Sequence, residues 1–148
     1  MSDPGINAAN QASRHRLVAL AASLDAAALA TDIGGGWTVA MALGHLAYWD
    51  WHAVACWRRA DDGSIPRDWI EPSATIVNDA IEGLLAALPG VAATQLAISA
   101  AEELDAVVAA LPDATIEALI AAGQGWMADA AEHRDEHIAQ IEEGLGRA

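Results

Sequence analysis

The sequence contains no lysine and no phenylalanine, and basic residues of any kind are few. Seven arginines stand against 21 aspartates and glutamates among 148 residues, so the formal net charge is −14. A protein that binds nucleic acid needs a basic surface, and so does one that binds an anionic membrane. We therefore expect no nucleic-acid partner and no membrane partner, and we interpret the acidic excess as a solvated surface.

Long apolar runs and cysteines are also scarce. Charges or glycines interrupt every apolar run well before the roughly 18 residues that a membrane-spanning helix needs. Residues 1–16 lack the basic segment and apolar core of a signal peptide. Cys56 is the single cysteine and can form no internal disulfide, which is typical of a reducing compartment. The sequence thus predicts a cytoplasmic protein.

Alanine and helical periodicity dominate what remains. Alanine is the best helix former and β-branched residues are sparse, so the composition favours an all-α fold. A chain of 148 residues has the size of one domain with its own core. We predict a single helical-bundle domain over residues 1–148, built as a four-helix bundle of long amphipathic helices.

Caps and apolar stripes place these helices. The first ends at the three glycines within residues 31–37, because consecutive glycines terminate a helix. The second begins at Thr38, a typical N-cap, and runs to residue 60. The third covers residues 91–112, and the last covers residues 124–145. The predicted inward-facing residues of the first, third and last helices are Leu17, Leu20, Leu24 and Ala28; Leu96, Ala100, Leu104, Val107 and Leu111; and Met127, Ala130, Ile138, Ile141 and Leu145.

A long connection separates the second and third helices. Residues 61–73 contain two prolines and a glycine, so we predict an irregular segment there. A short helix follows through residues 76–88, capped by Ser73 or Thr75. Residues 113–123 form a connector or a helical turn. A crossover in the long connection would make the second and third helices parallel rather than antiparallel.

Two of the five histidines, His133 and His137, are four residues apart in the last helix. Residues with this spacing lie on one helix face, about 5–6 Å apart at Cβ, so the two imidazoles can bind one metal ion. Their stripe continues through Ala130 and Ile141, at the edge of the apolar face. An isolated pair of this kind is often a surface coincidence and is weak evidence alone.

A third histidine strengthens the interpretation. His45 lies on the second helix between the apolar positions Ala42 and Trp49. Three neutral imidazoles with an open coordination position are typical of a catalytic zinc site, and the same set accommodates nickel or iron. A single buried histidine more commonly bonds a carbonyl or a carboxylate. The metal hypothesis therefore requires His45 to face the pair on the last helix.

Aromatic residues near His45 are candidates for the wall of a pocket. Trp49 and His52 are the candidate pocket residues, although His52 also fits a half-exposed position near the end of the site. Tyr48, Trp51 and Trp126 could line the same space, but aromatics at helical spacing more often belong to the core.

Carboxylates flank the histidine pair. Asp129, Glu132 or Glu136 is a candidate acceptor for the outer N–H of a ligand histidine, and a solvated acidic helix face explains them equally well. We interpret His15 as a surface residue. We interpret Cys56 as a small core residue rather than a nucleophile, since no base neighbours it in the sequence.

Two motifs resemble signatures of the DinB/YfiT-like superfamily. Residues 34–52, GGGWTVAMALGHLAYWDWH, are similar to its second helix, with a tryptophan before the helix and a histidine eight residues later. Residues 126–145, WMADAAEHRDEHIAQIEEGL, are similar to its last helix, with two histidines spaced by four. Residues 77–88 and 97–119 are similar to its middle segments. The resemblance covers almost the whole chain and rests on the order and spacing of short motifs.

The resemblance implies a fold and a ligand set. The fold is a four-helix bundle of up-down-down-up topology with a long crossover between helices 2 and 3. The metal ligands are His45, His133 and His137. The ion is divalent, with zinc or nickel before iron. The superfamily includes metal-dependent enzymes that use low-molecular-weight thiols such as mycothiol or bacillithiol, among them mycothiol-dependent maleylpyruvate isomerase. It also includes members without known activity.

Two functions are therefore open. The first is a metal-dependent thiol S-transferase or isomerase that acts on a small-molecule substrate. The alternative is a non-catalytic small-ligand-binding or stress-associated helical bundle with a vestigial metal site. The intact histidine triad favours metal binding, but a fold and a ligand set do not determine a reaction. A homodimer remains an open option for the assembly.

Overall fold

The computed structural model describes residues 4–60 and 73–147. This part of the chain is mostly helical, as predicted, and its one departure from the all-α class is a small antiparallel hairpin. The elements in chain order are α1 (Pro4–Ala22), α2 (Ala26–Leu29), β1 (Asp32–Gly34), β2 (Trp37–Thr38), α3 (Val39–Arg59), α4 (Ala74–Ala87), α5 (Gly90–Ala109), α6 (Asp113–Ala121), the 3₁₀ turn η1 (Gly125–Met127) and α7 (Ala131–Gly144).

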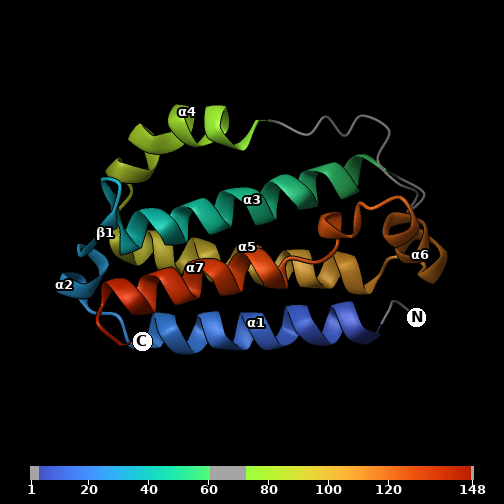
Figure 1. Ribbon diagram of the computed structural model, residues 1–148, viewed down its shortest axis with the longest axis horizontal. Helices are drawn as coiled ribbons and strands as arrows, with labels where there is room; N and C mark the ends of the chain where they lie inside the picture. Colours follow the sequence, from blue (N-terminus) through green and yellow to red (C-terminus); the bar gives the residue numbers. More distant parts are fainter. Residues whose placement is uncertain (1–3, 61–72, 148) are drawn as a thin grey trace.

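The helices α1, α3, α5 and α7 lie side by side and form a bundle (Figure 1). Helix α4 lies against α3 on the outside, and α6 lies at the end of the bundle (Figure 1). The contacts between α1 and α7 advance in the same order along both helices, from Ser13 with Ala131 to Arg16 with Asp135, so these two helices run in the same direction. Figure 1 shows α3 and α5 running parallel as well. No helix in the described ranges is long and apolar enough to cross a membrane.

The glycines after α2 build a turn rather than only ending a helix. Gly34, Gly35 and Gly36 have φ of 107°, 64° and 84°, a region that is open to glycine because it lacks a Cβ atom. The turn connects β1 to β2 and leads into α3. There Thr38 Oγ1 accepts a hydrogen bond from the backbone N–H of Met41 at 3.3 Å, which confirms the predicted N-cap.

The first predicted helix is interrupted. α1 ends before Asp25, whose carboxylate accepts a 2.8 Å hydrogen bond from the backbone N–H of Ala28 and so caps a separate helix, α2. Leu17 and Leu20 are buried in α1, whereas Leu24 lies in the break and is only partly buried. The prediction of one stripe was wrong because a short polar side chain competes for backbone N–H groups and starts a new helix.

The structure tests only part of what the sequence predicts for the connections. Residues 61–72, which hold most of the predicted irregular segment, lie outside the described residues. Ser73 occupies the N-cap position of α4, but its side chain makes no capping hydrogen bond. Within residues 113–123, for which a connector or a helical turn was predicted, Asp113–Ala121 form the helix α6.

Alanines make up much of the buried face of α5. Leu96 and Val107, predicted to face inward, are only partly buried, whereas Ala93, Ala97 and Ala101 are buried. Small side chains let α5 approach α3 closely, because the distance between packed helices follows the size of the side chains at the contact. The predicted Ala100, Leu104 and Leu111 are buried as well, so the inward face contains three of the five predicted residues together with these alanines.

Helix α7 begins seven residues later than predicted. The Asn10 side chain donates to the carbonyl of Ala128 at 2.9 Å and accepts from the N–H of Ala130 at 3.0 Å. The Asp129 carboxylate accepts from the N–H of Ala131 at 3.0 Å. These bonds satisfy backbone groups that a continuous helix would have paired internally. Of the predicted inward-facing residues, those that are buried are Met127, Ala130, Ile138 and Ile141.

A fully buried guanidinium connects the four bundle helices. Arg134 of α7 is 0% exposed, and it donates to Asp50 of α3 at 2.9 Å and to Asp105 of α5 at 2.8 Å. It also donates to the carbonyls of Asn10 in α1 and Ala101 in α5, both at 3.3 Å. Removal of one partner from such a network leaves an uncompensated buried charge, so the network restricts how the helices can move relative to one another.

This network separates two apolar clusters. One cluster contains Leu43 and Ile138, near the hairpin, and the other contains Val54 and Met127, near α6. Arg14 of α1 extends the network by donating to Asp105 at 2.7 Å. Apolar packing in the two clusters is non-directional. The hydrogen bonds and ion pairs of the polar layer between them therefore fix how the helices are aligned.

We predict that Arg134→Met lowers the free energy of unfolding by about 3–5 kcal/mol, because Asp50 and Asp105 lose their buried cation. Arg16→Met is the matched control, since Arg16 pairs with Asp135 between α1 and α7 but both side chains are partly exposed. Its loss should stay below about 1 kcal/mol. Urea denaturation at pH 7 measures both variants, and equal losses would contradict the role assigned to the buried network.

Candidate metal centre

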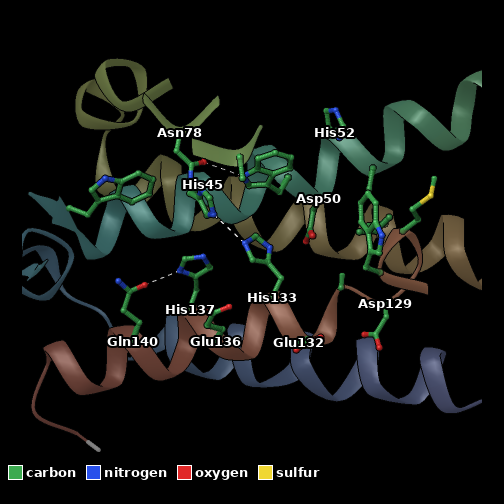
Figure 2. Close-up of a pocket in the computed structure, with 18 of the residues that line it drawn as sticks. His45, Asp50, His52, Asn78, Asp129, Glu132, His133, Glu136, His137 and Gln140 are labelled. Carbon is green, nitrogen blue, oxygen red and sulfur yellow. Dashed lines mark hydrogen bonds between the residues drawn. The ribbon is translucent and has the colours of Figure 1, made fainter. Parts of the chain in front are cut away.

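Three histidines converge between α3 and α7 (Figure 2). One ring nitrogen from each of His45, His133 and His137 lies within 4.8 Å of the other two. The Nε2 atoms of His45 and His133 are 3.1 Å apart. The ring centroids of the three pairs are separated by 4.7, 4.8 and 5.2 Å. The structure therefore brings His45 to the pair on the last helix, as the metal hypothesis requires.

The donor set suits a divalent ion. Two zinc–nitrogen bonds of about 2.0–2.1 Å at a tetrahedral angle place the nitrogens roughly 3.4 Å apart, close to the separation of His45 and His133. The same separation suits a hydrogen bond between two neutral rings. The third imidazole, His137, is what makes the group a set of three ligands with room for a fourth.

The outer nitrogens of the triad have different surroundings. His137 Nδ1 lies 2.9 Å from Oε1 of Gln140, one helical turn further along α7. The Nδ1 atom of His45 is buried and has no hydrogen-bond partner within residues 4–60 and 73–147. The sequence had suggested a neighbouring carboxylate as acceptor, but for His137 the partner is the amide of Gln140. Such contacts orient a ligand ring and select its tautomer.

Burial keeps two of the imidazoles neutral. Desolvation, aided by the neighbouring His137 and His133, lowers the pKa of His45 to about 3, while the nearby Asn78 side chain opposes this shift. Desolvation is also the main cause that lowers the pKa of His133 to about 4, with contributions from His137 and Arg134. A neutral imidazole has a free lone pair, so both rings are ready to bind a metal ion at neutral pH.

The triad faces a cavity of about 790 Å³. Trp49 and His52, the two predicted pocket residues, both line it, and burial lowers the pKa of His52. Trp37 also lines it, with its indole edge-on to the ring of His45 at a centroid distance of 5.3 Å. The other lining residues are Gly34, Gly35, Asp50, Ala53, Ala74, Asn78, Leu104, Trp126, Met127, Asp129, Ala130, Glu132, Glu136 and Gln140.

Two of the three remaining aromatic candidates, Tyr48 and Trp51, lie outside the cavity lining. Tyr48 stacks on His52 with ring centroids 6.2 Å apart, and Trp51 donates to Glu103 at 2.8 Å. Neither belongs to the cavity lining, whereas Trp126 does. His15 is exposed, as predicted. Cys56 is partly buried, and burial raises the pKa of its thiol, which does not favour a nucleophilic thiolate.

Asp50 joins the cavity to the buried network. Its carboxylate is almost fully buried, lines the cavity and binds Arg134. Desolvation raises the pKa of Asp50 to about 6, against the opposing effect of Arg134. Sequence reasoning missed both residues. The available signal was the position of Arg134 in the apolar register of the last helix, four residues before the buried Ile138.

Comparison with known protein families shows which family this chain resembles. A family model described as the DinB superfamily matches residues 9–141, which include all three histidines. No curated protein and no solved structure matches the chain significantly.

We predict that acid destabilises the metal-free protein. The pKa values of His45 and His133 are lower in the folded state than the ordinary 6.5, so the unfolded chain binds more protons below that pH. Stability is therefore lost as pH falls from about 6.5 toward 4. The raised pKa of Asp50 acts in the opposite direction, but one carboxyl group opposes two imidazoles.

Thermal melts of metal-free protein at pH 7 and pH 5 test this prediction. His45→Leu should reduce the difference between the two melting temperatures, because one buried imidazole no longer resists protonation. His15→Leu, at an exposed histidine on α1, should leave the difference unchanged. A melting temperature that does not fall on acidification would show that the imidazoles are not the controlling groups.

Proposed function

The chain belongs to the DinB superfamily, and from this premise we propose that it is a metal-dependent thiol S-transferase or isomerase for a small-molecule substrate. The metal ligands in this proposal are His45, His133 and His137. The observation that carries it is the convergence of the three imidazoles on a cavity large enough for a small organic molecule. Zinc or nickel suits three imidazoles, and iron is the third candidate.

The fold proposed with this function is the up-down-down-up bundle. The parallel course of α1 and α7, and that of α3 and α5, supports this order (Figure 1). In such a bundle α3 supplies one ligand and α7 supplies two, so the site depends on the alignment of helices that are far apart in the sequence.

A bound divalent ion would supply Lewis acidity, which lowers the pKa of a coordinated thiol and favours its thiolate. The three histidines hold neutral nitrogen donors, and burial keeps His45 and His133 in that state at neutral pH. The indoles of Trp37 and Trp49 pack edge-on to His45 and limit access of water from that side. Reduced access of water strengthens electrostatic interactions within the site.

The proposed transfer is a substitution at carbon. The thiol loses its proton to solvent, its sulfur forms an S–C bond, and the electron pair of the broken bond departs with a leaving group such as halide. With an epoxide the C–O bond breaks instead, and the oxygen takes up a proton. The cosubstrate is a low-molecular-weight thiol of the mycothiol or bacillithiol kind, which the family membership supports.

We predict that purified, tag-free protein contains close to one divalent ion per chain by elemental analysis. At 100 times the dissociation constant, the ion should stabilise the fold by about 2.7 kcal/mol, or roughly 5–10 °C in melting temperature. His133→Ala should lose the bound ion and this shift. His15→Ala should keep both, and equal shifts for the two variants would indicate non-specific binding to the acidic surface.

We predict metal-dependent conjugation of a low-molecular-weight thiol to a haloaromatic compound or an epoxide. His45→Ala and His137→Ala should each remove most of the activity, and the double variant should lose little more, because each substitution destroys the same site. His52→Ala should have a smaller effect, through the pocket. Activity that survives complete removal of the metal would rule out this mechanism. A metal-loaded protein that is inactive with a broad panel of thiols and electrophiles would favour the alternative of a non-catalytic binding protein.

A further inference from the structure

The two ring nitrogens of His45 have different tasks. Its Nε2 atom lies 3.1 Å from Nε2 of His133, so this nitrogen faces the other ligands of the triad. Its Nδ1 atom is buried and has no hydrogen-bond partner among the described residues. A neutral imidazole carries one proton, so an Nε2 atom that binds an ion leaves that proton on Nδ1. A buried N–H group without an acceptor is unfavourable, and the ligand role of His45 therefore requires an acceptor at Nδ1.

Helix α4 contacts α3 on both sides of His45. A Cβ atom at Gly44 would lie 2.9 Å from Cδ2 of Leu85, so α4 packs directly on the α3 backbone at this level. Further along α3, Nε1 of Trp49 donates to Oδ1 of Asn78 at 3.4 Å. Asn78 stands seven residues before the buried Leu85, so both side chains share the face of α4 that is turned to α3.

The amide of Asn78 lies beside the ring of His45 (Figure 2). The indole N–H of Trp49 can only donate, so its contact orients the amide with the oxygen toward α3. Desolvation is the main cause of the low pKa of His45, and the Asn78 side chain acts against it, as an acceptor of a ring N–H does. Asn78 is therefore a suitable acceptor for the outer nitrogen of His45.

One amide oxygen is sufficient for both rings. A carbonyl oxygen has two lone pairs and accepts two hydrogen bonds. His45 and Trp49 are one helical turn apart on α3, with ring centroids separated by 6.3 Å, so their N–H groups can reach an acceptor between α3 and α4. The bond from Trp49 to Asn78 is long at 3.4 Å, so a small rotation of the amide toward His45 sacrifices little of it.

The second ligand with an outer amide gives a comparison within the same site. Nδ1 of His137 lies 2.9 Å from Oε1 of Gln140, which belongs to the same helix. Asn78 differs because it comes from α4, a helix outside the bundle of α1, α3, α5 and α7 (Figure 1). An acceptor role for Asn78 would therefore connect α4 to a centre whose ligands all lie on α3 and α7.

We propose that Asn78 is a positioning residue of the metal centre, whose amide oxygen accepts the Nδ1–H of His45 and so keeps the Nε2 lone pair directed at the ion. The inference rests on the proposed function in one respect, because it assumes that a divalent ion binds the triad. In the metal-free protein the same bond makes Nε2 of His45 an acceptor, and His133 donates across the 3.1 Å contact.

The tautomer of His45 in the metal-free protein tests this bond without a metal ion or an activity assay. Proton–nitrogen correlation spectra of protein with isotope-labelled histidine, recorded at pH 7, show which ring nitrogen carries the proton, and His45→Leu identifies the signals. The proton should be on Nδ1 in the wild type and in Asn78→Asp, and on Nε2 in Asn78→Leu, where Nδ1 has lost its acceptor. A wild-type His45 protonated at Nε2, or a tautomer that Asn78→Leu leaves unchanged, would overturn the proposal.

Affinity for zinc, measured by competition with a chromophoric chelator, tests the consequence for the metal centre. Asn78→Leu should weaken binding roughly 10- to 100-fold, which is the usual effect of removing a group that orients a ligand histidine. Asn78→Asp should bind at least as tightly as the wild type, because a carboxylate is a stronger acceptor than an amide. Thr75→Val, at an exposed position of α4, should leave the affinity unchanged.

Two results for zinc would overturn the role of Asn78. One is an Asn78→Leu variant that binds zinc as tightly as the wild type. The other is an equal loss of affinity in Asn78→Asp, which retains the acceptor. A wild-type protein that binds no zinc, nickel or iron would instead overturn the proposed function, and the tautomer of His45 would still decide whether Asn78 accepts its proton.

Discussion

The buried guanidinium of Arg134 is the constraint on which the arrangement of this bundle depends. It lies directly after His133 on α7 and binds Asp50, which is five residues after His45 on α3. If α7 slid or rotated relative to α3, a charge would remain buried without its partner, which is far more unfavourable than a change in apolar packing. The bonds that align the helices therefore also set the separation of the imidazoles on the two helices.

The same low-dielectric surroundings have opposite effects on the function and on the stability of the metal-free protein. Burial keeps His45 and His133 neutral, which a metal ligand must be, but it also makes their protonation in acid unfavourable to the folded state. A bound ion would offset this effect, since a ligand that binds only the folded chain stabilises it. The folded protein is therefore less stable without a bound ion than with one.

Local features were predictable from residue patterns, whereas the meeting of His45 with the pair on α7 was expected only from the family resemblance, and other contacts between distant segments were not predicted. The cap at Thr38 and the shared face of His133 and His137 follow from spacings of three and four residues, so they needed no tertiary information. The start of α7 depends on Asn10, which binds Ala130 from more than a hundred residues away. No local pattern near residue 124 contains that interaction, and a helix was therefore predicted where the chain makes a 3₁₀ turn.

The polar layer of the bundle does have a signature in the sequence. Arg134 stands four residues before the buried Ile138, and Asp50 stands four residues before the buried Val54, so both charges occupy the apolar register of their helices. A charge in that register must find an opposite charge from another helix, because an isolated buried charge is too unfavourable to persist. Opposite charges at core positions therefore predict which levels of two helices meet. A neutral histidine does not require a charged partner when it is buried. The pairing of Arg134 with Asp50 is therefore the stronger physical reason why His45 and His133 meet at this level of the bundle.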